Sequence, residues 1–259
     1  MSRGRVLAAI LAAGLCAGMC GADGVHAQET SQPHRIAGLA GAPPAPAAAR
    51  PASRAETVKV AMGCASLEAR EVIAWVIATG DNRGMPFVIV DKKQTKVLVF
   101  DGAGRLVGDT SALIGLARGD DSAPGVGIKN LSDIRPKERT TPAGRFVASL
   151  GQGVGKQDIL WVDYASALAL HRVLPANSHE HRLERLASTS PLDHRITFGC
   201  INVPAAFYDA VIDPTFAATS GIVYILPETR ANSAVFAIGA SLADSASAAT
   251  GSVPFSVDN

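Results

Sequence analysis

The spacing of apolar residues along the chain changes from a helical to a strand pattern. Over residues 68–79 apolar side chains recur every three or four positions, with Ser66 as a cap and Gly80 as a stop, which predicts one helix. From Pro86 onward, short runs rich in Val, Ile and Phe predict β-strands. These runs lie at residues 87–90, 97–100, 106–107, 146–147, 159–162, 168–173 and 222–226.

The order of these elements indicates the fold class. Many short strands separated by turns with Gly and Pro are typical of a mainly β, sandwich-like domain with a few short helices. A glycine-rich phosphate loop is not found, which argues against a nucleotide-binding α/β sheet. A second helix is expected over residues 205–212, beginning after Pro204 and stopped by Pro214.

The two ends of the chain differ from its middle in composition. Residues 1–27 combine Arg3 and Arg5, an uncharged apolar run and small residues up to Ala27, which predicts a secretory signal peptide cleaved near Ala27. Residues 28–56 predict a Pro- and Ala-rich linker, residues 57–228 the domain, and residues 229–259 an Ala- and Ser-rich tail. We therefore expect a protein of the periplasm or cell envelope. It is not expected to be an integral membrane protein, because no later segment is long and apolar enough.

Charge and cysteine content narrow the function classes. Lys and Arg total 24 against 23 for Asp and Glu, so no basic field exists and nucleic acid is not an expected partner. Cys16 and Cys20 leave with the signal peptide, so Cys64 and Cys200 remain. In an oxidising compartment these two can pair as a disulfide, or one thiol can be kept for chemistry. The count alone leaves both alternatives open.

The residues around Cys200 are the sharpest local feature. Residues 197–202 read Thr-Phe-Gly-Cys-Ile-Asn. Gly199 allows a substrate carbonyl to approach the backbone closely, and a helix beginning soon afterwards favours the thiolate. Backbone N–H groups at this turn can stabilise an oxyanion. Cys200 is therefore the candidate nucleophile.

A nucleophilic cysteine needs a base, and four histidines precede it in the sequence. His171 ends the apolar run of residues 168–170, so a strand can hold its imidazole rigidly, and we favour it as the base. His179 and His181 lie in a polar segment, and His194 lies near a turn. The His179-x-His181 spacing lacks a second ligand pair, so neither a metal nor another cofactor is expected.

Together with residues 141–146, Thr-Pro-Ala-Gly-Arg-Phe, these residues resemble the catalytic domain of L,D-transpeptidases over about residues 86–227. That family's pattern is a His, a spacer, Ser or Thr, usually His, Gly, Cys, an apolar residue, and Asn or Arg. Thr197 and Asn202 match its polar positions, and Gly199 with Cys200 would supply backbone donors.

The resemblance implies a reaction as well as a fold. Cys200 would attack the carbonyl between the third and fourth residues of a peptidoglycan stem peptide, and His171 would take the thiol proton. An amine of a second stem peptide, or of an envelope lipoprotein, would then resolve the thioester. No cofactor is implied.

The sequence departs from the family pattern in two places. Phe198 replaces the usual histidine before the glycine, and 29 positions separate His171 from Cys200, which is longer than the family spacer. The excess falls in residues 178–194, a charged insertion that could act as a lid or transfer the role of base to His181.

Two other functions stay open at this stage. If water resolves the thioester, the protein is an L,D-carboxypeptidase or endopeptidase using the same site. If Cys64 and Cys200 form a disulfide, it is an inactive wall-binding protein.

Overall fold

A computed structural model describes residues 63, 65–174 and 177–238 of the chain. The predicted signal peptide, the linker up to residue 56, Cys64 and residues 239–259 lie outside the described residues. Over the ranges that the structure describes, none of the helices combines the length and the apolar character needed to cross a membrane.

Helix α2 (Leu67–Thr79) forms where the sequence predicts it. The Ser66 hydroxyl accepts a hydrogen bond from the Ala69 N–H at 3.1 Å, and Gly80 closes the helix in a left-handed conformation with φ 66°. Its buried face carries Val72, Ile73 and Val76. The helix is therefore fixed by its caps and by docking of one apolar side.

The described strands form one large sheet and one small one. The eight-stranded sheet has the order β3-β2-β1-β10-β5-β6-β7-β9, and β4 pairs with β8 separately. The strand bounds are β1 Phe87–Asp91, β2 Lys96–Phe100, β3 Leu106–Ser111, β4 Ile114–Gly115, β5 Gly144–Gln152, β6 Asp158–Asp163, β7 Leu168–Arg172, β8 Arg195–Thr197, β9 Ile201–Val203 and β10 Gly221–Ile225. The mainly β class with a few short helices is confirmed.

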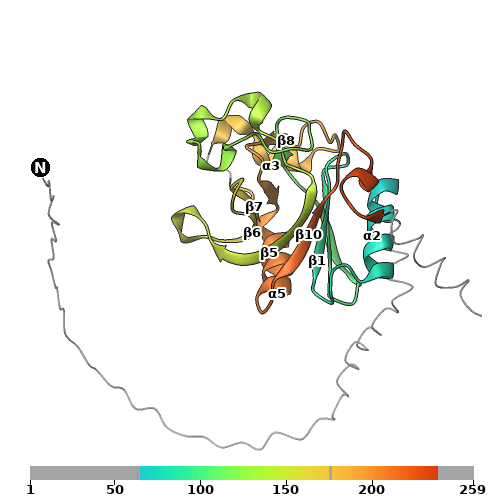
Figure 1. Cartoon of the computed structure of the whole chain (residues 1–259). Coiled ribbons are helices and arrows are strands. Elements are labelled where there is room, and N and C mark those ends of the chain that lie inside the picture. The colour runs from blue at the N-terminus through green and yellow to red at the C-terminus, as the bar shows by residue number, and fades with distance from the viewer. Residues whose placement is uncertain (1–62, 64, 175–176, 239–259) are drawn as a thin grey trace, which may run out of the picture. The chain divides into compact units, whose positions relative to one another are not determined.

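Both faces of the large sheet are buried at strands β1, β2 and β10, whereas β3, β5 and β6 carry exposed residues. Strands β1 and β10 run parallel at its centre, with Phe87 opposite Ile222. One face packs on α2, and the other packs on the helical segment after β9 (Figure 1). Because alternate residues of a strand point to opposite faces, two buried faces give the continuous hydrophobic runs seen in the sequence.

The sheet curls around the hydrophobic core between it and the helical segment after β9. In a flat sheet β1 and β9 would lie about 24 Å apart, at about 4.8 Å for each of five strand spacings. Yet Val88 of β1 and Ile201 of β9 belong to one hydrophobic cluster, together with Tyr208 and Phe216. The curl gives the domain its sandwich-like character, as the sequence predicted.

The connection between β4 and β5, residues 116–143, is long and lies at the upper end of the sheet in Figure 1. We name it the covering loop. It contains three short 3₁₀ helices, η1 Val126–Ile128, η2 Leu131–Asp133 and η3 Pro136–Glu138. Further short helical turns lie elsewhere, at η4 Val154–Lys156, η5 Ser178–Glu180, α3 Arg182–Ala187 and η7 Asn232–Ala234.

The helical segment after Cys200 is longer than predicted. It runs through α4 (Ala205–Phe207), a π-helical stretch η6 (Tyr208–Ile212) and α5 (Asp213–Phe216), so Pro214 does not stop it. Pro214 instead lies in the first turn of α5, where a missing N–H costs nothing. The Asp213 N–H bonds back to the Tyr208 carbonyl, and this wider turn accommodates the proline ring.

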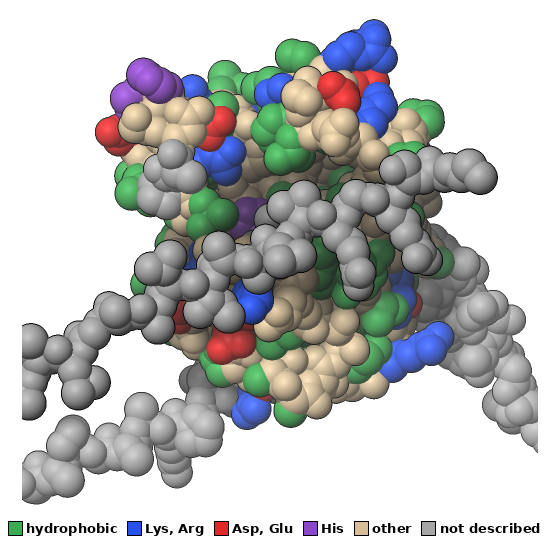
Figure 2. Space-filling view, turned by 90° about the vertical axis from the view of Figure 1, so that its left-hand side faces the viewer, with side chains coloured by type: hydrophobic (Ala, Val, Ile, Leu, Met, Phe, Trp, Pro, Cys, Tyr) green, Lys and Arg blue, Asp and Glu red, His purple; other side chains and the backbone are tan. Residues whose placement is uncertain are grey.

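The beginning of the predicted C-terminal tail is part of the core. Phe236 and Ile238 are buried in the cluster that contains α2, and the Asn232 amide donates to the Glu68 carbonyl at 2.9 Å. On the face shown in Figure 2, basic and acidic side chains of the described residues are interspersed rather than gathered in fields of one sign.

Candidate active site

The parallel pairing of β7 and β9 brings three of the predicted site residues together. His171 on β7 lies directly opposite Asn202 on β9, and Cys200 immediately precedes β9. Because side chains alternate along a strand, Cys200 and Asn202 project on the same face as His171. Asn202 is 1% exposed, so solvent does not reach this face of the sheet at the residue that follows Cys200 by two positions.

A braced turn presents Cys200. The Thr197 hydroxyl donates to the Cys200 carbonyl at 2.6 Å and accepts from the Gly199 N–H at 3.2 Å. Gly199 adopts φ +137°, and a Cβ there would lie 2.9 Å from the Thr140 carbonyl oxygen. Both the conformation and the close approach of the covering loop therefore require glycine.

Thr141 fixes the orientation of the peptide group between Gly199 and Cys200. Its hydroxyl accepts from the Gly115 N–H at 2.9 Å and donates to the Gly199 carbonyl at 2.7 Å. In a trans peptide the carbonyl and the following N–H point in opposite directions. The Cys200 N–H therefore points away from Thr141, and it has no hydrogen-bond acceptor among the described residues. Such a donor can bind a developing oxyanion.

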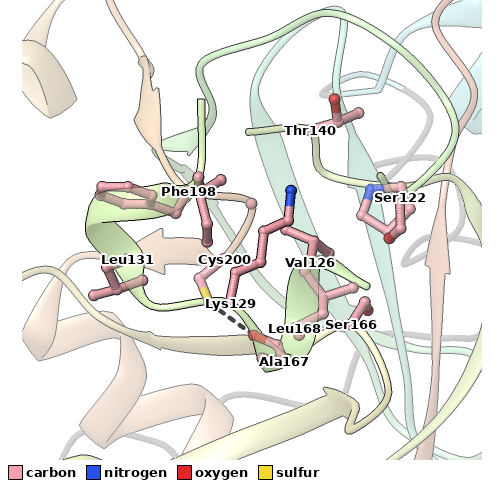
Figure 3. A pocket seen from close by; sticks show the side chains of 14 residues that line it. Ser122, Val126, Lys129, Leu131, Thr140, Ser166, Ala167, Leu168, Phe198 and Cys200 are labelled. Carbon is pink, nitrogen blue, oxygen red and sulfur yellow. Dashed lines mark hydrogen bonds between the residues drawn. The ribbon is translucent and has the colours of Figure 1, made fainter. Parts of the chain in front are cut away.

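The Cys200 thiol faces a small open pocket. Its Sγ lies 3.5 Å from the Ala167 carbonyl oxygen, and Figure 3 shows the sulfur directed toward that oxygen. The covering loop and the turn before β7 supply most of the wall. The lining residues are Ser122, Val126, Gly127, Lys129, Leu131, Ile134, Thr140, Pro142, Ser166, Ala167, Leu168, Phe198, Gly199 and Cys200.

Phe198, which occupies the position of the family's usual histidine, forms part of this wall. The Arg139 guanidinium lies over its ring, 4.0 Å from the centroid, in a cation–π contact. The Nε of Arg139 also donates to the Ile134 carbonyl at 3.1 Å. The aromatic ring therefore fastens the covering loop to the turn that carries Cys200.

His171 is held by two hydrogen bonds, neither of them to the thiol. Its Nδ1 lies 2.8 Å from the Arg172 carbonyl oxygen, and its Nε2 lies 3.0 Å from Nδ2 of Asn202. Within the described part of the chain, no hydrogen bond joins His171 and Cys200. The structure places the two residues on one face of neighbouring strands without joining them directly.

The surroundings of His171 and Cys200 favour the uncharged form of both side chains. Burial lowers the pKa of His171 and outweighs the hydrogen bond to the Arg172 carbonyl, which raises it; the nearby positive charge of Arg182 lowers the pKa further. Burial raises the pKa of the Cys200 thiol, against smaller opposing effects of the Ala169 N–H and Arg182. Both shifts favour a thiol beside a neutral imidazole over a thiolate–imidazolium ion pair.

The other histidines lie apart from the thiol. His181 is exposed, and its Nδ1 lies 2.5 Å from Glu184, its neighbour on α3. The buried His194 bonds Thr95 through Nδ1 and the Ser188 carbonyl through Nε2. In the described ranges no three His, Cys, Asp or Glu side chains gather as they would around a metal ion.

A buried charge cluster anchors the covering loop behind the site. The Lys92 ammonium donates to Asp120 at 2.8 Å and to the Thr141 carbonyl at 3.0 Å. Its third donor goes to the Gly119 carbonyl at 2.6 Å, and both side chains of the Lys92–Asp120 pair are 1% exposed. Glu228, paired with Arg195, also accepts from the Gly119 N–H at 2.9 Å. The cluster thus holds both ends of the loop that carries Thr141.

No protein-family model and no curated protein sequence matches the chain. Matching solved structures include an L,D-transpeptidase of Xylanimonas cellulosilytica, 17% identical with a TM-score of 0.34, over 54% of this chain and 60% of that one. The helical cell shape determining protein Pgp2 of Campylobacter jejuni is 14% identical with a TM-score of 0.38, over 61% and 56%. The catalytic domain of an E. faecium L,D-transpeptidase is 14% identical with a TM-score of 0.29, over 54% and 95%.

Two of these three are L,D-transpeptidases, the family that the sequence motifs resemble. The first two matches span less than two thirds of the matched chains. Identities and TM-scores at this level do not assign a reaction. The function is therefore argued from the chain's own residues.

Sequence reasoning missed three residues that shape the site. Thr141 was noticed within a motif, but its hydrogen bond to Gly199 depends on a contact across the fold. Arg182 and Lys92 gave no signal, because charged residues in a polar insertion and after a strand look like solvated surface. Their burial becomes evident only once the covering loop and the insertion are packed on the sheet.

Proposed function

We propose that this chain is a cysteine acyltransferase of the L,D-transpeptidase type, acting on peptidoglycan stem peptides. The observation that supports it most directly is the turn at Gly199 and Cys200. Both residues line one pocket, and the Cys200 N–H has no acceptor among the described residues. The substrate class comes from the motif resemblance. Such a substrate requires export, for which the sequence predicts the signal peptide of residues 1–27.

The first half of the proposed reaction forms a thioester. Cys200 Sγ attacks the carbonyl carbon of the scissile amide while its proton passes to Nε2 of His171. The Cys200 N–H stabilises the oxyanion. The tetrahedral intermediate then collapses, the C–N bond breaks, and the leaving amine takes the proton from His171. Because thiol and imidazole are neutral at rest, proton transfer accompanies the attack.

The second half returns the thiol. An amine of a second stem peptide attacks the thioester carbonyl and gives a proton to His171, the C–S bond breaks, and Cys200 regains its proton. Water in place of the amine would make the protein a carboxypeptidase or endopeptidase. An envelope lipoprotein as acceptor would follow the same chemistry.

The proposal is tested by intact mass of the protein after incubation with a carbapenem, whose strained amide acylates an active thiol. We expect one adduct per chain on the reduced protein, and none on the Cys200→Ala variant with an unchanged circular dichroism spectrum. Absence of an adduct on folded, reduced protein would argue against an acyl-accepting site.

Two further measurements separate the alternatives. Thiol titration of the exported, unreduced protein finds reactive Cys200 if the site is active and no thiol if Cys64 and Cys200 are paired. Mass spectrometry of products from a tetrapeptide donor, with and without an acceptor amine, distinguishes transfer to an amine from transfer to water.

Replacing Thr141 with Val should slow carbapenem acylation about tenfold to a hundredfold, because the Cys200 N–H is no longer held in place. The loss is expected to stay below the roughly 10²–10³ typical of deleting an oxyanion donor outright. Thr141→Ser, which keeps the hydroxyl, should retain most of the rate. Stopped-flow rates for the three proteins check this, and equal rates for Val and wild type would contradict it.

A further inference from the structure

Arg182 reaches the site from outside the sheet. It begins α3 within the charged insertion, yet its side chain is only 14% exposed. One guanidinium nitrogen, Nη1, donates to Oδ1 of Asn202 at 2.8 Å, and Nε lies 2.5 Å from Oε2 of Glu180. Asn202 in turn contacts His171. The insertion is therefore linked to the candidate base through a single amide.

The hydrogen-bonding roles along this chain of contacts are fixed. A guanidinium can only donate, so the Asn202 oxygen must face Arg182. The Asn202 amide nitrogen then faces Nε2 of His171 at 3.0 Å, and that nitrogen can only donate. Nε2 must therefore accept with its lone pair. The imidazole proton lies on Nδ1, which donates to the Arg172 carbonyl at 2.8 Å.

We propose that Arg182 is a positioning residue that acts through Asn202. It keeps the Asn202 amide nitrogen turned toward Nε2 of His171, so that Nε2 stays without a proton, while the Arg172 carbonyl holds the proton on Nδ1. The catalytic meaning of this inference rests on the proposed function, because a bare Nε2 is what can accept the thiol proton. The same arrangement disfavours the imidazolium, whose Nε2–H would face an amide NH₂ and a positive charge.

The charged groups around His171 also disfavour its imidazolium form. On the side of His171 that faces Asn202 lie Cys200, which precedes β9, and Arg182 on α3, whose guanidinium also pairs with the Glu180 carboxylate on η5. The Arg172 side chain projects on the opposite face of β7. Burial and the Arg182 charge both lower the pKa of His171, in agreement with a base held neutral.

The test is ¹⁵N NMR of the histidine side chains in the full chain across a pH titration. The His171 signals are assigned by their loss in His171→Gln. Wild type and Arg182→Lys, whose ammonium also only donates, should show one tautomer with well separated Nδ1 and Nε2 signals. In Arg182→Met the amide is free to turn its oxygen toward Nε2, where it can accept from the imidazolium, so the titration midpoint should move to higher pH. The neutral ring should keep its proton on Nδ1, because the Arg172 carbonyl still accepts there.

An unchanged titration midpoint in a folded Arg182→Met protein would overturn the proposal. A second variant tests the same contact without removing Arg182, in case Arg182→Met disorders the segment around α3. Asn202→Asp, which can only accept at this position, should raise the His171 midpoint even with Arg182 present, and no rise would likewise contradict the proposal. These readouts need no turnover. A protein that shows them but is not acylated would fail the proposed function and leave the role of Arg182 intact.

Discussion

Replacing His171 with Ala should lower the rate of Cys200 acylation at least about a hundredfold at neutral pH, the usual loss for a missing general base. The loss is expected to be large because the thiol pKa is raised by burial, so little thiolate forms without a base. Acylation rates measured by intact mass over time, at several pH values, check this. The deficit should narrow at alkaline pH, where hydroxide removes the thiol proton.

His181→Ala is the matched control. Its ring is exposed and paired with Glu184, so the rate should stay within about twofold of wild type. If His181→Ala loses the activity and His171→Ala keeps it, the base lies in the insertion and our assignment fails.

The second large effect concerns stability. Lys92→Met should lower the free energy of unfolding by about 3–5 kcal/mol, the typical cost of removing one partner of a buried ion pair. The change leaves the Asp120 carboxylate and two backbone carbonyls without their ammonium partner. Urea unfolding of both proteins measures the difference.

Lys93→Met is the control for this experiment. Lys93 pairs with Glu68, but both side chains are more than 40% exposed, so its loss should cost less than about 1 kcal/mol. Equal losses for the two variants would mean that the buried cluster contributes no more than a surface pair.

The cluster around Lys92 and Asp120 also makes the stability of the fold depend on pH. Burial alone would raise the pKa of Asp120, but hydrogen bonds from Lys92, Thr229 and backbone N–H groups outweigh it and hold the pKa below its usual range. An Asp has a pKa of about 3.9 in the unfolded chain. Because the pKa of Asp120 is lower in the folded protein, its carboxylate stabilises the fold fully above that value, and this stabilisation is lost as the pH falls through the folded-state pKa. Wild type should therefore lose stability below about pH 4 more steeply than Lys92→Met.

Local signals in the sequence predicted helix α2 and the longer strands, but not the short strands β4, β8 and β9. The caps at Ser66 and Gly80 and the apolar runs of the strands predicted their positions, because these features act within a few residues. Pro214 was misjudged for the opposite reason. Whether a proline stops a helix depends on the turn before it, and the π-helical widening at residues 208–212 leaves no simple periodic pattern.

The candidate site was only partly predictable. The sequence singled out His171, Asn202 and Cys200, but the pairing of β7 with β9 that places them on one face was not predicted. The orientation of the Asn202 amide beside His171 depends on Arg182, and the direction of the Cys200 N–H depends on Thr141. Arg182 and Thr141 both come from segments distant in sequence from the residues that they orient. Contacts of this kind are set by tertiary packing, which spacing does not encode.

The parallel pairing of β1 with β10 has a consequence for how the domain folds. Phe87 meets Ile222 at the centre of the sheet, so that ladder cannot form until almost the whole domain is available. Topologies dominated by such distant pairings fold slowly, typically in milliseconds to seconds, because loop closure must precede the contacts that reward it. A chain that still lacks β10 can pair β1 only with β2, so one edge of an apolar strand stays open until the end of the domain is available.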